Sequence, residues 1–96
     1  MDDKLLELRN HSYTAGIRYD RARQACTDTL FKHMKENGSA FAECTQAANA
    51  YGVALSKLLS HLLSLPQSDQ IKAESARTRK ILDLLDKEIE LMQERF

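Results

Sequence analysis

The middle of the chain carries apolar residues at alternating intervals of three and four positions, and this pattern constrains the fold more than any other feature. It continues without interruption from residue 41 to residue 65. Residues at this spacing share one face of a helix and form the stripe along which coiled-coil helices pack. The stripe consists of Phe41, Cys44, Ala48, Tyr51, Leu55, Leu58, Leu62 and Leu65. A long amphipathic helix is therefore predicted here.

Two further stripes with the same spacing flank the first. The N-terminal one comprises Leu5, Leu8, Ser12, Ala15, Tyr19, Ala22, Cys26 and Leu30, widened by Phe31 and Met34. The C-terminal one comprises Ile71, Ser75, Thr78, Leu82, Leu85, Ile89, Met92 and Phe96. A chain of 96 residues that is 43% hydrophobic and lacks Trp suits one aliphatic helical core. We predict an all-α fold: one domain, residues 1–96, with three long amphipathic helices in an antiparallel bundle or coiled-coil arrangement that forms oligomers.

Turn and capping residues place the predicted helices at about residues 3–37, 40–65 and 67–95. Gly38 can close the first helix, and Pro66 ends the second because proline cannot donate the helical hydrogen bond. Ser68 or Asp69 can cap the third helix. Gly16 leaves two interpretations open, since glycine inside a helix costs about 1 kcal/mol relative to alanine. The first helix either continues through this position or breaks there.

The middle helix is almost without charge. Residues 39–65 contain one acid, Glu43, and one base, Lys57, whereas the C-terminal segment carries many charges of both signs. A helix without a charged face is usually covered on more than one side. The alternative is that a helix at the centre of a small bundle exposes little of its surface. We predict a partner interface formed by the off-stripe residues Gln46, Asn49, Val53, Ser56, Ser60 and Leu63.

The residues that usually carry chemistry are scattered. His11, His33 and His61 lie far apart in the sequence, and Cys26 and Cys44 have no spacing typical of a zinc site or a disulfide framework. The three glycines are isolated, so no phosphate-binding loop is present in the sequence. We expect reduced thiols, no enzymatic activity, no cofactor, no metal and no small-molecule substrate.

The charges balance, with 14 basic and 14 acidic residues, so no global field attracts nucleic acid or an anionic membrane. Local basic clusters are interpreted as solvated helix faces that can pair with acids such as Asp20 and Glu74. They comprise Arg18, Arg21, Arg23, Arg77, Arg79 and Lys80. Lys57 interrupts the most apolar segment, residues 47–65, and the first residues lack the pattern of a signal peptide. We therefore expect a cytoplasmic protein without a membrane span.

These observations favour a non-enzymatic helical protein–protein interaction module that self-associates through its middle helix and acts as an adaptor, chaperone-like binder or inhibitor. The alternative is a small DNA-binding transcriptional regulator with a C-terminal dimerisation helix. Residues 45–59 resemble a helix-turn-helix in which Gly52 makes the turn, and the DNA contacts would then be Ser56, Lys57, Ser60 and His61. Two features count against this alternative: the stripe passes through the proposed turn undisturbed, and the reading helix has a single lysine.

Overall fold

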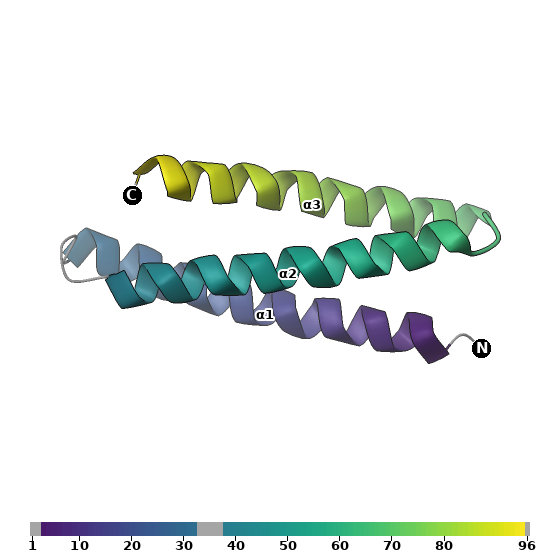
Figure 1. Cartoon of the computed structure of the whole chain (residues 1–96), viewed down its shortest axis with the longest axis horizontal. Coiled ribbons are helices and arrows are strands. Elements are labelled where there is room, and N and C mark those ends of the chain that lie inside the picture. The colour runs from purple at the N-terminus through teal and green to yellow at the C-terminus, as the bar shows by residue number, and fades with distance from the viewer. Residues whose placement is uncertain (1–2, 33–37, 96) are drawn as a thin grey trace.

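A computed structural model describes residues 3–32 and 38–95, which form three long helices (Figure 1). They are α1 (Asp3–Lys32), α2 (Gly38–Ser64) and α3 (Asp69–Arg95). Each helix runs antiparallel to the next along the chain, so α1 and α3 point the same way (Figure 1). The predicted all-α arrangement is confirmed for the described residues.

The three helices form an elongated slab with α2 in the middle (Figure 1). The slab measures 50 × 22 × 15 Å between Cα atoms. Its radius of gyration is 15.4 Å, against about 12 Å for a compact domain of this length. In the described part of the chain, α2 packs against both neighbours, while no Cα of α1 lies within 8 Å of a Cα of α3. The outer helices therefore meet through side chains rather than by close backbone packing.

The turn between α2 and α3 is built by side-chain caps. The Gln67 side-chain amide donates to the carbonyl oxygens of Leu62 and Leu65, at 3.0 and 2.7 Å, and so satisfies the end of α2. The Ser68 hydroxyl accepts a hydrogen bond from the Ile71 amide at 3.3 Å and caps α3. Because Gln67 and Ser68 act as caps, α3 begins at Asp69 and not at residue 67 as predicted. The predicted end of the first helix, residues 33–37, lies outside the described residues.

Helix α1 continues through Gly16, so the interpretation in which it breaks there is wrong. The glycine serves packing: a Cβ atom at this position would lie 3.1 Å from Cζ of Tyr51 on α2. That separation is tighter than ordinary van der Waals contact. A residue that weakens the helix locally thus allows the ring of Tyr51 to lie against the backbone of α1.

The predicted stripes form the core, which divides into two apolar clusters along the length of the slab. One contains Tyr19, Cys44, Ala47, Ala48, Leu55 and Leu85. The other contains Leu5, Leu8, Leu58 and Leu62. Between them along α1 and α3 lie the buried hydroxyl residues Ser12, Ser75 and Thr78. Stripe positions 26, 30, 31, 34, 41, 92 and 96 fall outside the residues whose side chains are described.

Candidate functional site

The six residues predicted as a partner interface all lie exposed on one face of α2. This face lies opposite the buried stripe, and the two large apolar residues in it, Val53 and Leu63, are 54% and 53% exposed. The alternative in which a central helix has little exposed surface does not describe this molecule. The six residues also repeat the three–four spacing: Gln46, Asn49, Val53, Ser56, Ser60 and Leu63. We call these residues the outer stripe of α2, and its coverage by a partner stays a prediction.

A groove of about 570 Å³ lies beside the outer stripe, between α2 and α3. Asn49, Val53 and Ser56 form one side of it, and the charged residues Arg79, Asp83 and Asp86 belong to the other. The outer stripe is therefore bordered by charges of both signs on its α3 side.

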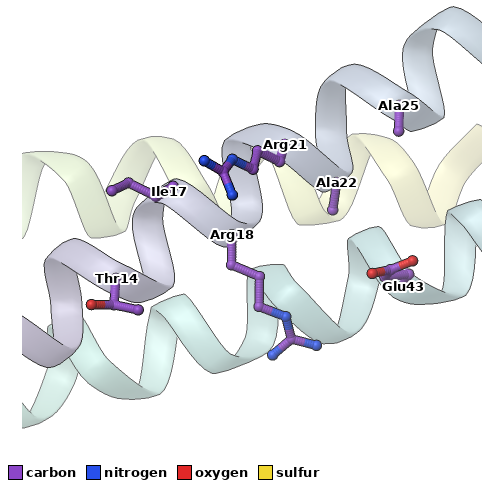
Figure 2. Close-up of a pocket in the computed structure, with 7 residues that line it drawn as sticks. All are labelled: Thr14, Ile17, Arg18, Arg21, Ala22, Ala25 and Glu43. Carbon is purple, nitrogen blue, oxygen red and sulfur yellow. The ribbon is translucent and has the colours of Figure 1, made fainter.

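On the other side of α2, a pocket of about 390 Å³ lies against α1. Figure 2 shows Arg18 reaching from α1 across α2, with Glu43 nearby on α2. Neither Arg18 nor Arg21, which also lines this pocket, has an acid within ion-pair distance in the described part of the chain. These two arginines fit the predicted solvated face, whereas the third member of their cluster, Arg23, is paired with Glu88.

The helix-turn-helix of the alternative prediction is not formed. Residues 45–63 lie within one uninterrupted α2, and no described glycine has the positive φ that a tight turn uses. Among the proposed DNA contacts, Ser56, Lys57 and Ser60 are exposed, but His61 is partly buried. The undisturbed apolar stripe explains this outcome, because continuous packing against α1 and α3 requires a continuous helix.

Helices α1 and α3 are joined by two charged clusters in the same register. Nε of Arg9 donates to Oε2 of Glu74 at 2.8 Å, and Nη2 of Arg9 donates to Oε1. Two heptads further along both helices, Nη2 of Arg23 lies 3.3 Å from Oε1 of Glu88, and the hydroxyl of Tyr19 donates to Oε2. We call the space between α1 and α3, framed by these two clusters, the α1–α3 seam.

The electrostatics of the seam are those of a structural contact. The hydrogen bond from Arg9 holds the pKa of the Glu74 carboxyl below its usual value. Burial, followed by the hydrogen bond to Glu88, raises the pKa of the Tyr19 hydroxyl well above its usual value. Burial also raises the pKa of Tyr51, whose ring centroid lies 6.0 Å from that of Tyr19. Both phenols therefore stay neutral, and a neutral phenol is a poor nucleophile.

No match is found for this chain among protein-family models, curated proteins or solved structures.

Among the described residues, no three His, Cys, Asp or Glu side chains are grouped closely enough to hold a metal ion. Cys26 and His33, whose spacing allows them to share a helix face, lie outside the described side chains. None of the described helices has a stretch that is both long and apolar enough to cross a membrane.

Sequence reasoning missed a set of large apolar residues on α1 and α3. The sequence predicted solvated, charged faces on these helices, yet the exposed residues also include Leu6, Tyr13, Ile81, Leu84 and Leu91, of which Ile81 and Leu84 line a pocket in the seam. A signal for them exists in the sequence, because Leu6 precedes Tyr13, and Leu84 precedes Leu91, by one heptad outside the main stripes. These pairs form a second row on each outer helix, which we call the seam rows.

Proposed function

We propose that this chain is a non-enzymatic helical interaction module that self-associates through the outer stripe of α2 and acts as an adaptor, chaperone-like binder or inhibitor of a partner protein. The observation that carries the proposal is the outer stripe itself: an exposed, uncharged face with the three–four spacing of packing helices. α2 already packs one such stripe against α1 and α3, so a second stripe is expected where a further helix covers it.

The side chains of the outer stripe support close packing of two copies. Ser56 and Ser60 are small, so a second helix can approach, and no like charges repel one another across the face. Covering a neutral polar surface also costs less hydration energy than covering a charged one. A two-fold pair is the most common oligomer and brings the same patch of both copies together.

The flanking charges favour an antiparallel pair. Glu43 and Lys57 are both exposed and lie two heptads apart on the same edge of α2. In an antiparallel pair, the Glu43 end of one copy faces the Lys57 end of the other. In a parallel pair, each charge would instead lie level with the same residue of the other copy. Electrostatics therefore favour the antiparallel orientation.

Light scattering coupled to size-exclusion chromatography tests the proposal. The wild-type chain should elute as a dimer, and Val53→Glu should convert it to a monomer without loss of helicity by circular dichroism. Leu84→Glu is the matched control, because Leu84 has the same 54% exposure but lies on the opposite side of the slab. A monomeric wild type at high concentration, or a dimer that tolerates Val53→Glu, would contradict the proposal.

Charge reversal tests the orientation. Lys57→Glu should weaken an antiparallel dimer by placing like charges opposite each other, and the added change Glu43→Lys should restore it. Restoration in the double variant requires that the two positions face one another across the interface. A parallel dimer would gain nothing from the second change.

A further inference from the structure

The α1–α3 seam is an open side of the helical slab. In a closed three-helix bundle each helix packs closely against both others, but here the described Cα atoms of α1 and α3 stay more than 8 Å apart. Both outer helices lie against α2, with α3 and α1 on its two sides (Figure 1). This is the arrangement of three corners of a four-helix bundle, with the fourth corner above the seam.

The seam contains a pocket of about 190 Å³ between the outer helices. Its apolar lining comes from Tyr51 of α2 and from Ile81, Leu84 and Leu85 of α3. The rest of the lining is polar or charged and consists of Tyr19, Asp20, Arg23 and Glu88. Tyr51 can line it because Gly16 has no side chain to cover the ring. A pocket of this size accommodates one large apolar side chain, the kind of anchor that dominates helix-in-groove binding.

The seam rows extend this apolar surface along both helices. On α3, Leu84 lines the pocket and Leu91 lies one heptad further along the same face. On α1, Tyr13 lies one heptad before Asp20, an acid that also lines the pocket. Tyr13 is 72% exposed, and Leu84 and Leu91 are more than half exposed. Large apolar residues grouped along two adjacent helices mark an interaction site, whereas single exposed ones are ordinary.

The charges beside the seam are unequal. On α3, the exposed cations Arg77, Lys80 and Lys87 flank the row of Leu84 and Leu91. No acid in the described part of the chain lies within ion-pair distance of any of the three cations. After Arg9, Arg77 helps to lower the pKa of Glu74, and the acids Asp83 and Glu90 lie on the same helix, but all three cations are exposed and can pair with an acidic ligand that lies along α3.

We propose that the α1–α3 seam binds an amphipathic helix of a partner protein, with its apolar stripe on the seam rows and an acidic edge along Arg77, Lys80 and Lys87. One anchor side chain of that helix enters the pocket above Tyr51. This binding site lies on the other side of the slab from the outer stripe of α2, so it is independent of self-association. The concave shape favours a helix over a flat membrane surface, which cannot reach the floor between two helices.

The probe is a designed amphipathic peptide of about 20 residues, which spans about 30 Å as a helix. It carries leucines at heptad spacing, one tryptophan and glutamates along one edge, and its twin carries lysines instead. Because the chain contains no Trp, the emission of the peptide tryptophan reports binding without background. The glutamate peptide should bind at least about tenfold more tightly than the lysine peptide, and the Lys80→Glu/Lys87→Glu variant should reverse this preference.

Two matched variants locate the binding site. Leu84→Ser should weaken binding of the glutamate peptide by about tenfold, whereas Val53→Ser, at equal exposure on α2, should leave it unchanged. Tyr13→Ser provides a second seam variant on α1, so the result does not depend on one substitution. Equal binding of both peptides, or wild-type affinity in both seam variants, would overturn the proposal.

Two further outcomes would assign the seam to another occupant and also overturn the proposal. If Leu84→Ser and not Val53→Ser abolishes self-association in light scattering, a second copy of this chain covers the seam. If the wild-type chain binds phosphatidylserine vesicles through Leu84 but ignores both peptides, a membrane covers it. Loss of the dimer in Val53→Glu with unchanged peptide binding would support both proposals, since it separates the two sites.

Discussion

Replacing Ser75 with alanine should stabilise the fold, because its hydroxyl is buried without a hydrogen-bond partner. Ser75 is 8% exposed on the core-facing side of α3. An unsatisfied buried hydroxyl costs about 1–3 kcal/mol, since it gives up its bonds to water and regains none. Alanine removes that cost and adds up to about 0.5 kcal/mol of helix propensity. Allowing for the small space that the missing oxygen leaves, we expect the free energy of unfolding to rise by about 1.5 kcal/mol.

Ser12 provides the matched control. It is also 8% exposed in the core, but its hydroxyl donates to the carbonyl oxygen of Arg9 at 2.9 Å. Ser12→Ala loses this bond, worth about 1 kcal/mol, and gains helix propensity, so its stability should stay within about 0.5 kcal/mol of wild type. Thermal unfolding followed by circular dichroism at one protein concentration should show a midpoint roughly 6–12 °C higher for Ser75→Ala. If Ser75→Ala stabilises no more than Ser12→Ala, the unsatisfied hydroxyl carries no penalty and the reasoning fails.

Two other predictions concern Gly16 and Glu74. In a Tyr51→Leu background, Gly16→Ala should raise the free energy of unfolding by about 1 kcal/mol through helix propensity. With Tyr51 in place, the gain should be smaller because the added Cβ lies 3.1 Å from the ring. Equal gains in urea unfolding would show that the contact is unimportant. The pKa of Glu74 is lowered by Arg9, so its stabilising effect is present above the unfolded-state pKa and disappears as the pH falls through the folded-state value. Glu74→Gln should therefore destabilise the chain at neutral pH and approach wild type in acid, whereas Glu90→Gln, at an exposed position, should show no such convergence.

Periodicity was sufficient to predict the three helices and most of their buried faces. Even the polar members of the stripes, Ser12, Ser75 and Thr78, lie in the core, because their position in the heptad decides their burial. The helix ends were predicted less well, since α3 begins two residues late. That start depends on the Ser68 hydroxyl, which caps α3, whereas the sequence left Ser68 and Asp69 as alternative caps.

The open seam could not be predicted from the stripes. Stripe spacing says which face of each helix is buried, but not how far α1 and α3 stand apart around α2. That distance is bridged by side chains from different helices, such as Arg9 with Glu74 and Arg23 with Glu88. These partners lie sixty-five positions apart in the chain in both cases. Only the fold reveals that the four side chains share one register and that the seam rows lie beside them.

Gly16 is the position in α1 with the lowest helix propensity, and it also affects the floor of the seam. Local propensity disfavours a glycine in the middle of a thirty-residue helix, and the helix forms nonetheless. Such disagreements between local preference and the final fold tend to occur at functional or strained positions. Here the backbone is unstrained, since no described glycine has a positive φ. What the glycine achieves is a close approach of Tyr51 that leaves its ring in the floor of the seam. An alanine would give α1 a better helix, so the presence of glycine is explained by the close packing of Tyr51 against the backbone of α1.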